Sequence, residues 1–205
     1  MFAPAPYFEP DIAIAQALIE EIRLGTIVTG APMLAASHVP FMVDRARGGR
    51  GTLVGHVDRR NPQWQAIAAT SEVLVTFLGP DAYVSPTWYG SQPRVPTWLY
   101  AAVHVYGRPC MVQDAAGLEK MVVALCDTME PADSAWRPAQ IGTYIDRLLN
   151  GIVGFEIEIT RIETQLRLAQ QNTDADRRAV RGALEKGSLQ DRRIAGLMNR
   201  LLPLE

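Results

Sequence analysis

The chain has 205 residues, of which 48% are hydrophobic and 20% charged, so it is long enough to bury a sizeable core. Its formal net charge of −2 and its pI near 6.0 exclude the strongly basic character that is typical of chains that bind nucleic acid over their whole surface. Its apolar runs stay below the ~18 residues needed to cross a bilayer, so we expect no membrane partner.

Two further features predict a cytoplasmic protein. Residues 1–10, MFAPAPYFEP, lack the basic and apolar regions of a signal peptide. The cysteines, Cys110 and Cys126, form neither a metal-binding spacing nor a disulfide framework, which is typical of proteins in a reducing compartment.

The N-terminal part of the chain predicts one helix followed by many strands. Asp11 is a candidate cap for a helix that ends near Gly25. Short β-branched runs, separated by Gly, Pro or Asn, then predict strands at 26–30, 36–44, 51–57, 72–79, 81–89, 95–107 and 151–160. Pro40 indicates an edge strand or a bulge, and residues 45–51 indicate a hairpin tip. This density of strands favours a small barrel or sandwich.

Helices interrupt and follow these strands. We expect one at 61–68, with Asn61 as its cap, and an amphipathic one at 114–130. Residues 174–185 and 188–202 predict two surface helices, in a stretch that is richer in Lys and Arg than in Asp and Glu. The expected class is therefore α+β and mostly antiparallel, with a main domain at 1–170 and a helical extension at 171–205.

The run VPTWLYAAVHVYG, residues 95–107, has two contrasting faces. Because strand side chains alternate, Leu99, Ala101, Val103 and Val105 share one aliphatic face. The opposite face carries Trp98, Tyr100, His104 and Tyr106. With further rings between residues 83 and 89, these side chains are typical of a pocket for a flat ligand with polar edges, although each ring by itself fits a packed core equally well.

Ligand-binding residues are more prominent than catalytic ones. GxSxG, Walker, HExxH and CxxC patterns are absent from the sequence. His38, His56 and His104 all lie in predicted strands, where they are either ordinary strand residues or metal ligands; with no carboxylate or Cys beside them, we expect no metal. His56, Arg59, Arg60 and Asn61 precede a short helix, where cations and backbone N–H groups favour an anion such as a phosphate.

Five segments carry a resemblance to a known family. ASHVP, GHVDRRNPQW, AYVSPTWY, VPTWLYAAVHVYG and IVGFEIEITRIE occur in the order and spacing of the PaiB-like FMN-binding negative transcriptional regulators. The chain resembles this family from about residue 1 to 185. The resemblance implies an FMN-binding split barrel, which is related to pyridoxamine phosphate oxidases and flavin reductases. It also implies a homodimer with FMN in clefts at the subunit interface.

The resemblance also implies a set of FMN-binding residues. Ser37 and His38 would lie beside the flavin, whereas His56, Arg59 and Asn61 would hold its phosphate with Trp64 packed below. Trp98 and His104 would line the cleft. The family's later Lys-Leu-Ser-Gln-Asn-Arg segment is RLAQQN here, which keeps a charge at Arg167 and the amide of Gln170 but differs at 169, 171 and 172.

Three functions remain open at this stage. The first is an FMN-binding negative regulator of transcription, acting as a homodimer with DNA or a protein as its regulatory partner. The second is an FMN-dependent flavin reductase or oxidase. The third is a haem-binding split barrel in which a histidine ligates iron. With no carboxylate pair or activated nucleophile in the sequence, we expect the protein groups to bind and orient the flavin, which carries any redox chemistry itself.

Overall fold

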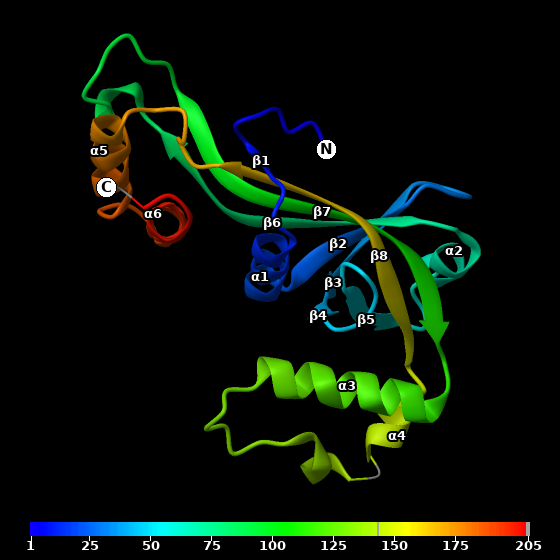
Figure 1. The fold of residues 1–205 in the computed structure, drawn as a ribbon. Coiled ribbons are helices and arrows are strands. Elements are labelled where there is room, and N and C mark those ends of the chain that lie inside the picture. The colour runs from blue at the N-terminus through cyan, green and yellow to red at the C-terminus, as the bar shows by residue number, and fades with distance from the viewer. Residues whose placement is uncertain (143, 204–205) are drawn as a thin grey trace. The chain divides into compact units, whose positions relative to one another are not determined.

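The structure is a computed structural model that describes residues 1–142 and 144–203. Residues 204–205, the end of the expected C-terminal extension, lie outside the described residues. Figure 1 shows the elements, which are in chain order β1 (Phe8–Glu9), α1 (Ile12–Ile22), β2 (Leu24–Thr29), β3 (Ala35–Pro40), β4 (Met42–Asp44), β5 (Thr52–Asp58), α2 (Gln63–Ala69), β6 (Val73–Val84), the 3-10 turn η1 (Pro86–Trp88), β7 (Thr97–Val112), α3 (Ala115–Met129), the 3-10 turn η2 (Pro138–Ile141), α4 (Tyr144–Leu149), β8 (Ile152–Arg167), α5 (Asp174–Leu184) and α6 (Leu189–Leu201).

The strands form one sheet in the order β3-β2-β6-β7-β8-β5-β4, and β1 pairs with β8 off this path. The pairs with a described register are antiparallel; for example, Leu24 lies opposite Pro40 and Thr52 opposite Glu158. The predicted α+β, mostly antiparallel class is confirmed. β3 ends at Pro40 and lies at one end of the sheet order, as expected for a proline that cannot donate to a neighbouring strand.

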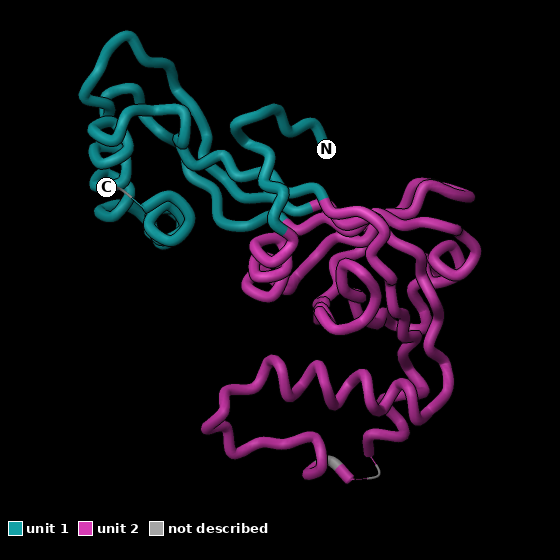
Figure 2. Tube along the Cα trace, viewed as in Figure 1, with its two compact units in different colours: residues 1–11, 78–103, 163–205 teal, residues 12–77, 104–162 magenta. Residues whose placement is uncertain are grey.

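The chain divides into two compact units (Figure 2). Unit 1 comprises residues 1–11, 78–103 and 163–205, and unit 2 comprises residues 12–77 and 104–162. Both chain ends therefore belong to unit 1. The predicted domain boundary between residues 170 and 171 remains a prediction.

The core of unit 2 is built around Phe41. Its ring centroid lies 5.6 Å from that of Phe77, edge to face, and 6.2 Å from that of Phe155. Gly25 leaves room for these rings, because a Cβ there would lie 2.7 Å from the ring of Phe77. On β5, a Cβ at Gly55 would lie 3.2 Å from Phe41 and from Val39 of β3, so these two strands pack closely as well.

The parts of β7 and β8 that belong to unit 2 also approach each other closely. A Cβ at Gly107 of β7 would lie 2.5 Å from the carbonyl oxygen of Glu158 on β8. Further along β8, Gly154 lies under Leu118 and Met121, the two buried side chains of α3. Both glycines are therefore required by close packing rather than by a turn.

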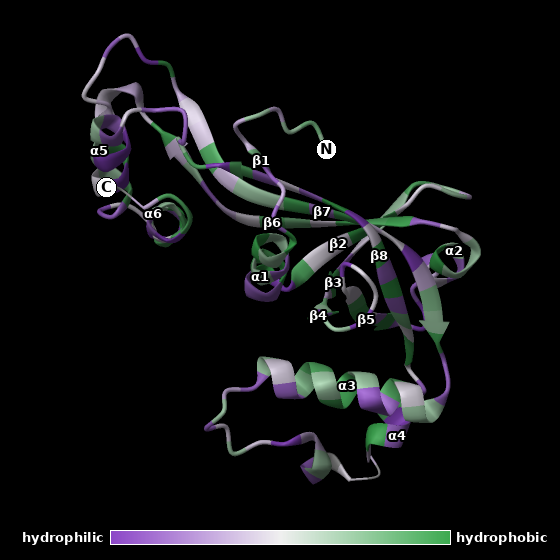
Figure 3. Cartoon of the chain, viewed as in Figure 1, coloured by the Kyte–Doolittle hydropathy of each residue, from purple (hydrophilic) through white to green (hydrophobic). Residues whose placement is uncertain are grey.

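In unit 1 the C-terminal helices pack on each other (Figure 1). Val180 and Leu184 of α5 are fully buried, as is Ile194 of α6. The remainder of α5 is mostly hydrophilic (Figure 3). Thr173 and Ser188 cap the two helices through side chains that accept from the N–H groups of Asp176 and Asp191, respectively.

Most of the predicted elements are confirmed, but several strands are divided differently. The strand expected at 36–44 is two strands, β3 and β4, which are separated at Phe41. Residues 72–79 and 81–89 were expected as separate strands, but Pro80 lies within the single strand β6. α2 begins at Gln63 rather than at Asn61, and the short helix α4 was not predicted. Within the described residues, no helix has the length and hydropathy needed to cross a membrane.

Candidate functional site

The predicted FMN-binding residues fall into two sets, one in each unit. Unit 2 holds Ser37, His38, His56, Arg59, Asn61, Trp64 and His104. Unit 1 holds Trp98, Arg167 and Gln170.

Ser37 and Asn61 are brought together in unit 2. The Asn61 Nδ2 group donates to Ser37 Oγ at 2.8 Å, which joins β3 to the loop before α2. The Asn61 Oδ1 atom accepts from the Gln63 N–H at 3.0 Å and so opens α2, the role expected of it, although the helix starts later.

Gln63 supports this arrangement from below and was missed by sequence reasoning. It is buried, and its Nε2 group lies 3.2 Å from the carbonyl oxygen of Ile27 and 3.1 Å from that of Ala35. The amide thereby holds the β2–β3 pair against α2. A glutamine at the start of a helix is usually exposed, so the sequence alone gave no signal for this role.

His38 lies on the exposed side of β3, opposite Thr26 in the β2–β3 register. Its Nδ1 atom is 2.9 Å from Thr26 Oγ1, which orients the ring. An oriented ring with its other nitrogen on the exposed side of a strand is suited to contact a ligand.

His56 is half-buried in β5, and its Nδ1 atom meets no hydrogen-bond partner among the described residues although it is buried. Burial also lowers the pKa of this imidazole, which favours the neutral ring. A buried polar atom without a partner is uncommon in folded proteins and is a natural place for a ligand contact.

Arg59 has a structural task as well as the predicted binding role. Its Nε and Nη2 groups each donate at 2.9 Å, to the carbonyl oxygens of Asn150 and Ile152, respectively. Among the described residues, none accepts from its Nη1 group. Trp64 lies against the same loop, donating from its ring N–H to the carbonyl oxygen of Arg59 at 3.1 Å.

In unit 1, Arg167 and Gln170 hold neighbouring backbone and side chains. Arg167 Nη2 donates to Thr97 Oγ1 at 3.0 Å, and its guanidinium lies 5.5 Å from the ring centroid of Tyr7. The Gln170 side chain accepts from the Leu168 N–H and donates to the carbonyl oxygen of Pro6, so it closes the turn after β8.

The two-faced character of residues 95–107 is confirmed. Leu99, Ala101, Val103 and Val105 are buried. On the opposite face Ala102 is buried, whereas the four polar-aromatic side chains are half-buried or exposed. On that face the Trp98 side chain is 52% exposed and meets Tyr83 edge to face at 6.2 Å, within unit 1. His104 is half-buried in unit 2.

The most completely paired carboxylate of unit 1 was also missed. Asp176 is buried and accepts from the N–H groups of Gly90 and Ser91, from the Ser91 hydroxyl and from Arg94. The Ser91 hydroxyl, together with these other donors, holds the pKa of Asp176 below its usual value. Because every donor is already used within the unit, we assign this cluster to structure rather than to ligand binding.

These residues suit a phosphorylated, flat ligand better than a metal. The described side chains include no group of three or more His, Cys, Asp or Glu placed to hold a metal ion. The unit 2 set instead includes a guanidinium, three imidazoles, a hydroxyl and an amide. Ser37 and Asn61 meet each other, whereas Arg59 lines a separate cavity with Leu118, Asp146 and Asn150. Such donors and acceptors can hold a phosphate and the polar edge of a ring system.

Comparison with known proteins supports the FMN-binding family expected from the sequence. The family described as "Putative FMN-binding domain" matches residues 1–161. "Protease synthase and sporulation protein PAI 2" of Bacillus subtilis is 33% identical over 162 residues, which make up 77% of this chain and 76% of that protein. "Uncharacterized protein AN0679" of Emericella nidulans is 29% identical and covers 90% of each chain.

Solved structures share the fold at low sequence identity. The "conserved hypothetical protein Rv2991 from Mycobacterium tuberculosis" has a TM-score of 0.60 at 13% identity and covers 84% of this chain and 94% of its own. The "FAD and Heme binding protein from Mycobacterium smegmatis" has a TM-score of 0.58 at 17% identity, covering 78% and 73%. The fold is therefore the α+β split barrel expected from the sequence.

Proposed function

Because this chain belongs to the family of FMN-binding domains and its cofactor is FMN, we propose that it is an FMN-binding regulatory protein that acts as a homodimer. The observation that carries the binding site is the buried Nδ1 atom of His56, which lacks a partner among the described residues. Arg59 Nη1 and the exposed ring of His38 are further candidates for ligand contacts among the described residues of unit 2.

In this proposal different residues contact different parts of FMN. Arg59 would hold the FMN phosphate, since a guanidinium forms charge-assisted hydrogen bonds with phosphate oxygens. His56 and His38 would meet polar atoms of the flavin, with Ser37, Asn61 and Trp64 fixing the loop and β3 in place. When bound, FMN supplies reversible electron and hydride transfer. The chain's own residues bind it, orient it and exclude water from it.

The homodimer is supported by the apolar side chains that unit 1 leaves exposed. Leu78, Tyr83, Val95 and Trp98 are all exposed in this unit. Exposed groups of large apolar residues are typical of interaction surfaces. The family resemblance places FMN at such an interface, where Trp98 would reach the cofactor.

The regulatory role is supported by two observations of different kinds. The Bacillus subtilis relative is named a "protease synthase and sporulation protein", which we take to support a regulatory role. In this chain, α6 exposes Arg192, Arg193 and Arg200 while burying Ile194 and Leu197. A helix that presents arginines supports DNA as the regulatory partner, since guanidinium groups bind phosphates and guanine bases.

Absorption spectroscopy of the purified protein tests the cofactor. We expect a flavin spectrum and release of FMN, rather than FAD, on denaturation. A haem spectrum would contradict the proposal. Steady oxidation of a nicotinamide by the FMN-loaded protein would assign it instead to the flavin reductases.

The regulatory role is tested by titrating the FMN-loaded protein with upstream DNA of its own gene and with a scrambled duplex at several salt concentrations. Equal binding to both duplexes would contradict the regulatory role.

A further inference from the structure

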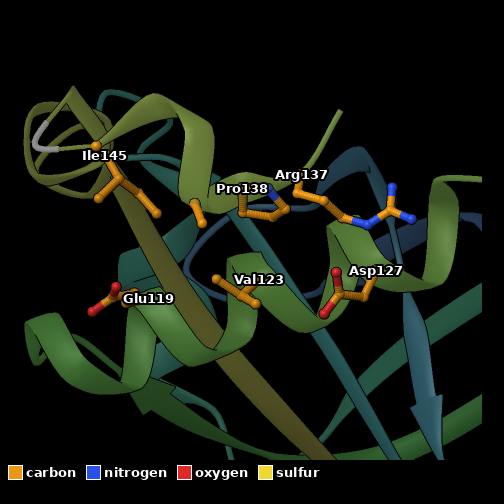
Figure 4. A pocket seen from close by; sticks show the side chains of 8 residues that line it. Glu119, Val123, Asp127, Arg137, Pro138 and Ile145 are labelled. Carbon is orange, nitrogen blue, oxygen red and sulfur yellow. The ribbon is translucent and has the colours of Figure 1, made fainter. Parts of the chain in front are cut away.

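A groove in unit 2 lies apart from all the predicted FMN-binding residues. It runs between α3 and the segment that contributes residues 137–139, 142 and 145, encloses about 500 Å³ and is shown in Figure 4. Its lining residues are Glu119, Val123, Asp127, Arg137, Pro138, Ala139, Gly142 and Ile145. None of the functions above uses them.

One wall of the groove is a single face of α3. Glu119, Val123 and Asp127 recur every fourth residue, so they follow one another along the helix (Figure 4). Leu118 and Met121 take the buried face toward Gly154 of β8, which leaves the Glu119 face to the groove.

The other wall is a segment held in shape by its own hydrogen bonds. Arg137 folds back on this segment, donating from Nη1 to the carbonyl oxygens of Ser134 and Trp136, both at 2.7 Å, and from Nη2 to that of Ala132 at 3.1 Å. Pro138 is buried and lies across from Val123 (Figure 4). The groove therefore has an apolar centre formed by Val123, Pro138 and Ile145.

The charges lie at the two ends of this apolar centre. The carboxylates of Glu119 and Asp127 are exposed and take part in no ion pair or hydrogen bond with the described side chains. Eight residues separate them along α3, which corresponds to about 12 Å at the helical rise of 1.5 Å per residue. Arg137 is the one cation of the lining, and three backbone carbonyls already engage its guanidinium.

This pattern excludes several ligand classes. An anion would be repelled by both carboxylates. A single metal ion, whose oxygen ligands lie at about 2.0–2.6 Å, cannot bridge carboxylates about 12 Å apart. A wholly apolar ligand would remove water from two charges without compensating them.

We propose that this groove binds a linear aliphatic cation that carries an ammonium group at each end, as polyamines do. The methylene chain lies on Val123, Pro138 and Ile145, one ammonium group pairs with Glu119 and the other with Asp127. The proposal goes beyond FMN binding and does not rest on it. It gives the protein a second small-molecule binding site, in unit 2, for a ligand whose charge is opposite to that of the FMN phosphate.

Calorimetric titration of the FMN-loaded protein with 1,8-diaminooctane, whose two ammonium groups are joined by methylenes alone, tests this. We expect saturable binding at one site, weakened by salt because exposed charges pair at both ends. Putrescine and n-butylamine should bind at least fivefold more weakly, since neither spans two carboxylates about 12 Å apart. Equal affinity for all three amines would overturn the proposal.

Variants of the groove make the test specific. Glu119→Gln and Asp127→Asn should each weaken the binding of 1,8-diaminooctane several-fold, and Val123→Trp should abolish binding by filling the apolar centre without a change of charge. Asp133→Asn, at an exposed acid outside the lining, is the matched control and should bind as the wild type does. An equal loss of affinity in the control would show that the ligand is attracted by general negative charge, and it would contradict the groove as the binding site. FMN affinity, measured for every variant, should not change, which separates failure of this site from failure of the cofactor site.

Discussion

Two adjacent arginines, Arg59 and Arg60, have different roles in the loop after β5. Arg60 is bound to its neighbour Asp58, donating from Nη2 at 2.7 Å, and this hydrogen bond lowers the pKa of Asp58 to about 2. Both side chains of that pair are exposed, so it contributes little to stability. Arg59 instead reaches Asn150 and Ile152, at the start of β8. One side chain is therefore local, and the other joins distant parts of unit 2.

Arg59→Ala tests the phosphate contact. We expect FMN binding to weaken by about 1.5–3 kcal/mol, the usual range for a lost charge-assisted hydrogen bond. Riboflavin, which lacks the phosphate, should bind equally well to both proteins. Fluorescence titration with each ligand measures the difference, and Arg60→Ala is the matched control. If riboflavin loses as much affinity as FMN, Arg59 acts only by holding the carbonyl oxygens of Asn150 and Ile152.

His56 should make stability depend on pH. Burial lowers its pKa in the folded protein, so the unfolded chain binds the proton more readily. Above the ordinary pKa of about 6.5 the ring is neutral in both the folded and the unfolded chain, so its burial requires no loss of a proton there. The free energy of unfolding should therefore fall as the pH drops below that value.

Denaturant unfolding of the wild type and His56→Gln at pH values on either side of about 6.5 measures this effect. The wild type should lose more stability than the variant on acidification. His38→Gln, at an exposed histidine, is the control and should keep the wild-type dependence. The opposite order of the two variants would contradict the assignment to His56.

For single residues, the sequence predicts local roles such as helix capping but not the hydrogen-bond partners that lie far away in the chain. Asn61 was expected to open a helix because its signal is local, and it does so through Gln63. The contacts of Arg59 lie 91 and 93 positions away in the chain, so no local pattern could reveal them. The same holds for Asp176, whose donors Gly90 and Ser91 are 86 and 85 positions away.

Among the elements, β6 and β7 illustrate when local patterns succeed. The faces of β7 were predictable because alternation follows directly from strand geometry. The single strand β6 was predicted as two, because Gly79 and Pro80 resemble a turn. The described pairing of β6 with β2 ends at Thr76, so the residues beyond need no donor on that side and a proline is tolerated there.

Gly107→Ala tests the close approach of β7 and β8. The new Cβ would lie 2.5 Å from the Glu158 carbonyl oxygen and from Ile157, so one strand must shift. We expect a loss of about 1–3 kcal/mol in the free energy of unfolding, as for other overpacked cores. Gly182→Ala in α5 is the contrasting control, because its Cβ would meet nothing within 4 Å. It should gain about 0.5–1 kcal/mol from helix propensity. Equal effects in denaturant unfolding would contradict the packing at Gly107.

At the scale of the whole molecule, the predicted FMN-binding residues are shared between two units, and both units leave large apolar side chains exposed. Unit 1 carries Tyr83 and Trp98, 45% and 52% exposed, within one aromatic contact. Sequence alternation placed Trp98 on the polar-aromatic face, but whether such a face is buried by a core or left exposed depends on the tertiary structure. Its exposure leaves it available to a second subunit.

Trp98→Glu tests the homodimer and its link to FMN. Sedimentation of the wild type at micromolar concentration should show about twice the chain mass of 22.6 kDa, because interfaces that bury large apolar side chains do not dissociate there. A charge in place of the exposed ring should shift the protein toward monomers. Trp136→Glu, at a tryptophan of unit 2 that is 38% exposed, is the matched control and should remain dimeric.

If FMN lies at the interface, its affinity for the wild type should also fall on dilution below the dimer dissociation constant. A wild type that sediments as a single chain would disprove the dimer, and FMN affinity independent of protein concentration would place the cofactor within one subunit.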